Sequence, residues 1–277
     1  EPFYANYNGF ALASDVNVIP ITSKIEDNFA LPSIHEFEKK INGKTRAILL
    51  CNPCNPTGYV YSQEEITNIA NLAKKNDLFI VVDEVYREFI YTDTKHFSIL
   101  EDEKFSENAI LIDSISKRYS LCGARVGFIV SKNSEFIDTC LKFALARLSP
   151  PTLALIAANH ALSSSDSYIK NVIREYYQRR EVIIDELSKI DNIKFSNPMG
   201  AFYSIIKLPI ENAEDFAKFL LTDFSYKNQS VMLSPASGFY SSENYGKDEV
   251  RIAFVLNSEK LKNAIKIIKL GLQEFIG

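Results

Sequence analysis

Short apolar runs separated by helical patterns fill the first half of the chain. Continuous runs of this kind are typical of strands that are buried on both faces. They lie at residues 16–20, 46–50, 78–82, 109–112 and 126–130. Because helices separate most of these runs, the pattern predicts an α/β fold with a parallel or mostly parallel central sheet and helices on both of its faces.

Two predicted helices begin with the same polar signature. Ser33 is followed three residues later by Glu36, and Ser62 is followed by Glu65. A serine at the start of a helix and a glutamate that reaches back to it form a capping box. Apolar residues then recur at helical spacing, which predicts helices that begin just after each serine.

The second half has a different order of elements. Helical patterns dominate residues 134–190. Strand patterns follow at 193–195, 201–208, 229–233 and 250–255, with helices at 211–223 and 258–275. This order predicts a second, smaller α+β domain. A serine-rich stretch places the boundary near residue 166, so we expect a large domain of residues 1–166 and a small domain of residues 167–277.

Composition and charge narrow the class of protein. The 277 residues are 46% hydrophobic and 24% charged, with a net charge of −4. These values exclude long disorder, and the acidic balance argues against a nucleic-acid partner. No apolar run approaches the ~18 residues of a membrane span, and four cysteines in so long a chain do not indicate a secreted disulfide scaffold. We expect a cytoplasmic protein, and because residue 1 is Glu, we expect its N-terminal part to be missing.

Polar side chains follow three of the predicted strands at the point where each strand ends. Residues 51–58 follow the first of these strands, residues 83–87 follow the next, and residues 113–118 follow the third. Ligands of open α/β sheets bind outside the carboxyl ends of the strands. The pattern therefore predicts a ligand site at this edge of the sheet.

The residues at this edge resemble a known family. The matching motifs are Asn52-Pro53-Cys54-Asn55-Pro56-Thr57-Gly58, Asp83-Glu84-Val85-Tyr86, Ser114-Ile115-Ser116-Lys117, Arg125-Val126-Gly127, Gly200-Ala201-Phe202-Tyr203 and Val250-Arg251-Ile252-Ala253. In order and spacing they resemble the class I/II aminotransferases, which are pyridoxal-phosphate (PLP) enzymes of fold type I. The resemblance covers the whole chain, and the family's N-terminal part is missing.

Lys117 is the first catalytic candidate. PLP is held by a lysine as a Schiff base, and the lysine then shuttles a proton between the substrate and the cofactor. An ordinary lysine is protonated at neutral pH, so it must be desolvated or lie near other cations to react. Arg118 and Arg125 are nearby in the sequence. The alternative is a solvated loop lysine.

The resemblance assigns Asp83, Tyr86 and Asn55 to the cofactor ring. Asp83 ends a buried strand, where an unpaired carboxylate would be costly, and a protonated pyridine nitrogen would be its partner. Tyr86 and Asn55 would hydrogen-bond the phenolic oxygen. The alternatives are a helix cap for Asp83 and core packing for Tyr86. Glu84 lies next to Asp83, so the two carboxylates are also candidates for an acid/base or metal pair. However, adjacent residues that leave a strand tend to point to opposite sides.

Other residues match the phosphate, ring and substrate contacts of the family. Hydroxyls and a planar guanidinium suit a phosphate, and the candidates are Ser114, Ser116 and Arg125. Tyr4 would stack on the pyridine ring, with Phe3 as the fallback and core packing as the alternative. Arg251 would bind the substrate α-carboxylate, and Asn55 would also touch it. A surface salt bridge is the alternative for Arg251.

The resemblance implies an aminotransferase that acts by a ping-pong mechanism on small-molecule substrates. Aspartate is the first guess for the amino donor, aromatic amino acids are the second, and 2-oxoglutarate is the expected acceptor. A homodimer is expected. Two alternatives stay open, namely a carbon–sulfur β-lyase on the same fold and a non-catalytic sensing domain. Cys51 and Cys54 are spaced as a redox or half-zinc pair, but we interpret both as packing residues and expect no metal site.

Overall fold

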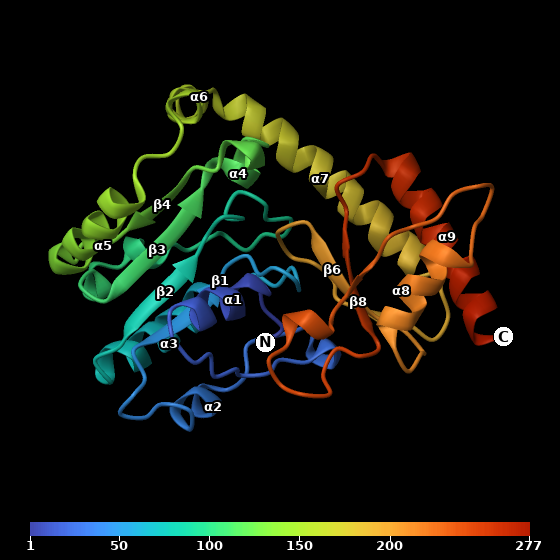
Figure 1. Ribbon diagram of the computed structural model, residues 1–277, viewed down its shortest axis with the longest axis horizontal. Coiled ribbons are helices and arrows are strands. Elements are labelled where there is room, and N and C mark those ends of the chain that lie inside the picture. Colours follow the sequence, from blue (N-terminus) through green and yellow to red (C-terminus); the bar gives the residue numbers. More distant parts are fainter. The chain divides into compact units, whose positions relative to one another are not determined.

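The computed structural model describes residues 1–277, except for the side chain of Asp166, and it forms two compact units (Figure 1). The central unit comprises Ser33–Cys54 and Val60–Ile173. The terminal unit comprises Glu1–Pro32, Asn55–Tyr59 and Arg174–Gly277. The last crossing between them, after residue 173, lies close to the boundary expected near 166. We expected a single boundary between residues 1–166 and 167–277. The terminal unit, however, also includes Glu1–Pro32 and Asn55–Tyr59, which that division places in the large domain.

A four-stranded sheet forms the core of the central unit. Its strands are β1 (Ala47–Cys51), β2 (Phe79–Asp83), β3 (Ala109–Ser114) and β4 (Gly127–Val130), in that order. The first three are parallel, and β4 is antiparallel to β3. The prediction of a mostly parallel sheet is therefore confirmed.

The central unit also contains helices, of which α3 (Gln63–Lys75) contacts the sheet most clearly. The others are α2 (Ile34–Glu38), α4 (Ile115–Arg118), α5 (Ser134–Arg147) and α6 (Thr152–Leu162), while α7 (Asp166–Leu187) continues into the terminal unit. Helix α3 contacts β1 and β2 and buries Ile66 and Ile69 completely. On β2, Ile80 is fully buried, whereas the neighbouring Phe79 packs on Phe136 of α5. Adjacent residues of β2 thus meet different helices, as expected for a sheet covered on both faces.

The terminal unit contains a smaller antiparallel sheet. Its strands are β5 (Lys194–Phe195), β6 (Tyr203–Lys207), β8 (Glu249–Ala253) and β7 (Ser234–Pro235), in that order. Its other helices are α1 (Asn6–Ala13), α8 (Ala213–Thr222) and α9 (Ser258–Ile276). Short 3₁₀ turns lie at Ile25–Asp27 and Ser237–Phe239 here, and at Ile99–Glu101, Glu103–Phe105 and Cys122–Ala124 in the central unit. The predicted α+β organisation of this part of the chain is present.

Two predicted strands are wrong. Residues 16–20 form no strand, and Val16 and Ile19 are exposed. Residues 229–233 also lie outside the sheet. There the positive φ angles of Lys227 and Asn228 turn the chain back on itself, and the strand begins only at Ser234. Within the described part of the chain, no helix combines the length and the apolar sequence that a membrane crossing needs.

The two predicted capping boxes have different outcomes. At α3, Ser62 Oγ accepts a hydrogen bond from Glu65 N (3.2 Å), and Glu65 Oε2 accepts one from Ser62 N (2.7 Å). At α2, Ser33 makes no side-chain cap, so the box predicted there is wrong. Glu36 pairs instead with Lys39, one turn further along the helix (2.6 Å). The nearby cation competes successfully for the carboxylate that a capping box would need.

This difference predicts unequal effects of two serine substitutions. Ser62→Ala should lower the free energy of unfolding by about 1 kcal/mol, because Glu65 N at the start of α3 loses its acceptor. Ser33→Ala is the matched control and should change the free energy of unfolding by less than about 0.5 kcal/mol. Urea unfolding followed by circular dichroism measures both, and equal losses would contradict the assignment of the caps.

Candidate active site

The ends of the parallel strands place Asp83 at the middle of the sheet edge. It pairs with Cys51 of β1 on one side and with Ile112 of β3 on the other. Beyond the strand register, Asp83 O accepts a hydrogen bond from Asn52 N (2.9 Å). The side chain of Asp83 is half-buried, and its Oδ1 accepts a hydrogen bond from Val85 N (3.2 Å). Backbone pairing on both sides therefore fixes this carboxylate at the sheet edge.

Lys117 and Tyr86 lie together at the same edge. Lys117 is half-buried on α4, a single helical turn that begins where β3 ends. Its Nζ lies 5.8 Å from the centre of the ring of Tyr86, which is buried with 3% of its surface exposed. An ammonium at this distance from an aromatic face is attracted to it. The solvated loop lysine, weighed above as the alternative, does not describe this position.

The structure brings two of the phosphate candidates together, and the third lies apart from them. Ser114 caps α4 by accepting a hydrogen bond from Ser116 N (3.3 Å), so both hydroxyls lie at the start of the helix that carries Lys117. Arg125 is exposed, and its Nη1 donates to Cys122 O (3.1 Å). The structure thus places the serines beside the lysine, while the guanidinium of Arg125 lies on the surface of its own loop.

Glu84 belongs to a separate network. It is fully buried and lies 2.9 Å from His96 Nε2. Its other oxygen accepts hydrogen bonds from Ser98 Oγ (3.0 Å) and Ile99 N (3.1 Å). Its partners differ from the partner of Asp83, which agrees with the expectation that the two carboxylates do not act as a pair.

Arg118 has a different role from the one that its sequence position suggests. The expectation was a cation acting near Lys117. Its guanidinium is buried and bound to Asp113 (2.7 Å) and Glu88 (3.2 Å). Two carboxylates thus balance its charge, so Arg118 is not the cation that sequence proximity suggests for Lys117.

In the terminal unit, the structure joins Asn55 to Arg251. Arg251 Nη1 donates a hydrogen bond to Asn55 Oδ1 (3.0 Å). The guanidinium also lies over the rings of Tyr203 (4.5 Å) and Phe239 (4.7 Å). Sequence reasoning assigned no role to these two aromatics. Tyr203 could have been found, since it ends one of the quoted motifs, whereas Phe239 stands in no motif.

The loop that carries Asn55 is held by a close backbone approach. Gly58 has a φ of +75°, and a Cβ there would lie 2.4 Å from the Cβ of Pro198. Its carbonyl accepts hydrogen bonds from both Met199 N and Gly200 N (2.8 Å each). Two of the quoted motifs thus contact each other, and only glycine fits at the contact.

Tyr4 lies in the same unit as Arg251. Its ring packs edge-on against Tyr7 with the centroids 5.5 Å apart, and its hydroxyl accepts a hydrogen bond from Asn6 Nδ2 (2.9 Å). The neighbouring Phe3 N donates to Phe239 O (3.0 Å). The N-terminal aromatic segment is therefore attached to the residue that stacks on Arg251.

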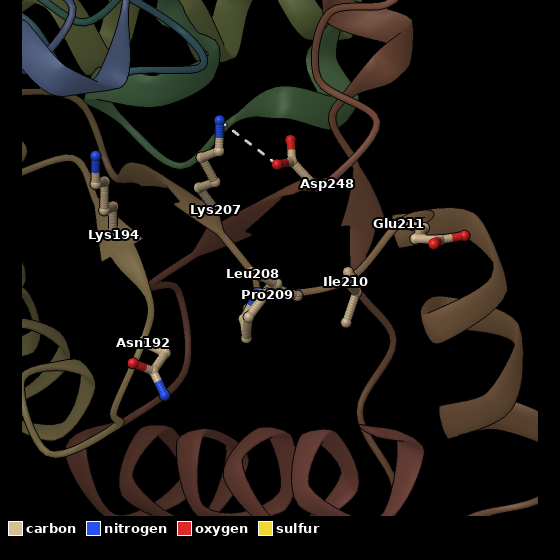
Figure 2. A pocket seen from close by; sticks show the side chains of 8 residues that line it. All are labelled: Asn192, Lys194, Lys207, Leu208, Pro209, Ile210, Glu211 and Asp248. Atoms are coloured by element: carbon tan, nitrogen blue, oxygen red, sulfur yellow. Dashed lines mark ion pairs between the residues drawn. The ribbon is translucent and has the colours of Figure 1, made fainter. Parts of the chain in front are cut away.

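Cys51 and Cys54 are both buried, and Cys51 Sγ donates a hydrogen bond to Pro53 O (3.4 Å). Among the described residues, no group of three His, Cys, Asp or Glu side chains could hold a metal ion. A pocket of about 340 Å³ lies in the terminal unit, and none of the predicted site residues lines it. Figure 2 shows the side chains that line this pocket. Its two lysines pair with carboxylates, Lys207 with Asp248 and Lys194 with Glu26.

Comparisons with known proteins identify the family and the fold of the chain. The family model described as aminotransferase class I and II matches residues 1–268. An aspartate aminotransferase of Pyrococcus horikoshii is 30% identical, and the match covers 99% of this chain and 68% of that protein. The crystal structure of an aromatic aminotransferase from Pyrococcus horikoshii OT3 matches with a TM-score of 0.88 and 28% identity, over 99% of this chain and 72% of that one.

A crystal structure of an aspartate aminotransferase from Thermotoga maritima matches with a TM-score of 0.87 and 30% identity, over 99% of this chain and 68% of that one. The chain thus spans about two thirds of the length of these proteins. It belongs to the aminotransferase class I and II family, has the fold of the PLP-dependent aminotransferases, and is an enzyme of that class.

The side chains of the central unit fit the cofactor chemically. PLP offers an aldehyde to an amine, a ring nitrogen to a carboxylate, a phenolic oxygen to a hydroxyl and a phosphate to several donors. Lys117, Asp83 and Tyr86 supply the first three groups at one edge of the sheet. The hydroxyls of Ser114 and Ser116 lie beside Lys117 and suit the phosphate.

A buried acid supports the strand that carries Arg251. Glu249 of β8 is buried, and its Oε2 accepts a hydrogen bond from Tyr240 Oη (2.7 Å). Burial raises the pKa of Glu249, the negative charge of Asp248 raises it further, and the bond from Tyr240 only partly offsets these effects. Burial and the nearby Glu249 also raise the pKa of Tyr240.

The raised pKa of Glu249 predicts a pH dependence of stability. Above its ordinary value of 4.5, the folded chain holds the Glu249 proton more tightly than the unfolded chain does. The free energy of unfolding should therefore rise as the pH falls from 7 toward 4.5, and Glu249→Gln should remove that part of the slope.

Glu36→Gln is the control for this measurement. The pKa of Glu36 is lowered by its hydrogen bond from Lys39, so Glu36 titrates below 4.5. The slope between pH 7 and 5 should then stay as in the unsubstituted chain. Urea unfolding at several pH values gives the slopes, and identical slopes for all three proteins would refute the assignment to Glu249.

Proposed function

We propose that this aminotransferase moves the amino group of an amino acid to a 2-oxo acid by a ping-pong mechanism, with aspartate as the first candidate donor, aromatic amino acids as the second and 2-oxoglutarate as the acceptor. The observation that carries the proposal is the position of the Lys117 amine beside the ring of Tyr86, at the edge where β2 ends in Asp83. The names of the relatives support the choice of donors.

We assign a task to each candidate site residue of the central unit. Lys117 forms the covalent link to PLP and, once displaced, carries the α-proton of the substrate. Asp83 keeps the ring nitrogen protonated, and Tyr86 donates to the phenolic oxygen. When bound, PLP supplies a ring that accepts the electrons released at the substrate Cα. The hydroxyls of Ser114 and Ser116 and, in its loop, Arg125 are the proposed phosphate donors.

Asn55 and Arg251 are the proposed substrate contacts in the terminal unit. The bond from Arg251 occupies Oδ1 of Asn55, so the amide is oriented with its Nδ2 group as the donor. The planar guanidinium of Arg251 suits a carboxylate, and donor and acceptor both carry one. A single carboxylate site of this kind can serve both half-reactions in turn. Tyr4 is the proposed aromatic partner of the cofactor ring.

We also propose that the protein is a homodimer and works in the cytoplasm. Helices α5 and α6 expose apolar side chains in the central unit, including Phe143 (73%), Leu145 (68%) and Leu153 (81%). Exposed apolar surface is typical of protein interfaces. None of the four cysteines is in a disulfide, which supports a reducing compartment.

Borohydride labelling tests the link to Lys117. PLP should attach irreversibly to the peptide that contains Lys117 after reduction, as detected by mass spectrometry. Lys117→Ala should abolish this label, because it removes the amine that lies beside the ring of Tyr86. Lys132→Ala removes an exposed lysine that pairs with Glu103 and should keep the label. A label retained at another lysine in Lys117→Ala would refute the assignment.

Steady-state kinetics with aspartate and 2-oxoglutarate test the role of Arg251. Arg251→Lys should raise KM for both acids about 10- to 100-fold, since a charge remains but the planar fork is lost. Arg179→Lys is the matched control in the same unit, where Arg179 pairs with Glu175, and its KM values should stay within about twofold of the unsubstituted chain.

The same assay separates the remaining activities. Amino transfer requires the acceptor and shows parallel lines in double-reciprocal plots, as a ping-pong mechanism demands. Release of pyruvate from a cysteine-type donor without any acceptor would indicate the β-lyase instead. PLP that is bound and reducible, with no turnover of any amino acid, would indicate a sensing domain.

A further inference from the structure

Four charged side chains of the central unit form a closed ring beside the proposed catalytic residues. Each arginine contacts both carboxylates, and each carboxylate contacts both arginines. We call this set the ion ring, and its members are Arg87, Glu88, Asp113 and Arg118.

Single oxygen atoms bridge the two guanidinium groups. Asp113 Oδ2 lies 2.7 Å from Arg118 Nη2 and 3.5 Å from Arg87 Nη2. Glu88 Oε1 lies 3.2 Å from Arg118 Nε and 3.6 Å from Arg87 Nε. The other oxygen of Asp113 accepts a hydrogen bond from Ser114 N (2.7 Å). Two positive and two negative charges alternate around the ring, so it adds no net charge near Lys117.

One side of the ring is buried. The side chains of Asp113 and Arg118 each expose 7% of their surface, whereas those of Arg87 and Glu88 expose about a third (33% and 32%). A buried ion pair adds little stability over an apolar pair of the same size, but it demands one geometry, because a displaced partner leaves an unpaired charge. The ring is therefore suited to fixing positions.

The ring members are sequence neighbours of the proposed catalytic residues. Arg118 directly follows Lys117 on α4, Arg87 directly follows Tyr86, and Asp113 directly precedes Ser114. The ring thus connects three segments that carry the amine, the phenol and a phosphate candidate. The first two segments also approach each other where Lys117 Nζ lies 5.8 Å from the centre of the Tyr86 ring.

We propose that the ion ring positions Lys117 against Tyr86, so that its members are positioning residues for the amine and the phenol. The role of the two positioned groups rests on the proposed function. The geometric part of the proposal does not, because the ring holds the segments together in the protein without cofactor.

An NMR experiment on the full chain without PLP tests the geometry. Lysine amines are converted to ¹³C-dimethylamines, and the Lys117 signal is identified by its loss in Lys117→Arg. The ring current of Tyr86 should displace this signal, and Tyr86→Leu gives the undisplaced position. Arg118→Met and Glu88→Gln should each move the signal toward that position, with the larger shift in Arg118→Met because it opens the buried side.

Arg180→Met is the matched control. Arg180 is also a buried arginine, whose guanidinium donates to Pro198 O and Asn197 Oδ1 in the terminal unit, and its loss should leave the Lys117 signal in place. Glu88→Gln alters a half-exposed residue and decides the test if Arg118→Met does not fold. An unchanged Lys117 signal in the folded ring variants would overturn the proposal.

A second readout connects the geometry to the cofactor. In the PLP-loaded chain, a bond from the Tyr86 hydroxyl stabilises the ionised phenolic oxygen, so its loss should move the pH midpoint of the visible spectrum upward. The ring variants should show this shift, and Arg180→Met should not.

If borohydride places no PLP on Lys117 of the unsubstituted chain, the proposed function fails, while the NMR result still decides whether the ring sets the position of Lys117. A moved NMR signal with an unmoved spectral midpoint would show that the ring positions the Lys117 amine in the chain without PLP, and it would overturn the role of the ring as a positioning device for the Tyr86 phenol in the loaded chain.

Discussion

The alignment of parallel strands is the constraint on which the candidate site depends. Register pairs Asp83 with Cys51 on one side and Ile112 on the other, and the backbone bonds continue past the strand ends to Asn52 and Glu84. Because the backbone groups of β2 are hydrogen-bonded to its neighbouring strands, the side chain of Asp83 keeps its position relative to β3. Helix α4, which carries Lys117, then begins directly at the end of β3. The functional groups thus inherit their spacing from the sheet.

Much of the fold could be predicted from periodicity alone. Continuous apolar runs located β1 to β4, although β4 and part of β1 are exposed in the structure, as Leu49, Ile129 and Val130 show. The same rule failed at residues 16–20 and 229–233, which are apolar without being paired in a sheet. Local sequence reports apolar character, whereas pairing depends on distant partners. The turn at Lys227 and Asn228 shows this, since non-glycine residues with positive φ gave no signal.

For the candidate site, too, one part could be predicted from the sequence and another could not. Motif spacing placed Lys117 and Tyr86 together, and Asn55 was expected to share a ligand with Arg251 rather than to bond with it directly. The residues that hold these groups were not found. Phe239 and the partners of Arg118 are brought in by tertiary packing, and an aromatic or a carboxylate at such positions is common on any surface. Identity of side chains suggests chemistry, but the supporting contacts appear only in three dimensions.

The position of Arg251 over the rings of Tyr203 and Phe239 has a consequence for its proposed role. Rings that lie against a guanidinium displace water from it, so a carboxylate that binds there displaces little further solvent. The in-plane donors of Arg251 stay available, as the hydrogen bond from Nη1 to Asn55 shows. For the proposed substrate carboxylate, part of the desolvation of the cation is thus complete before binding.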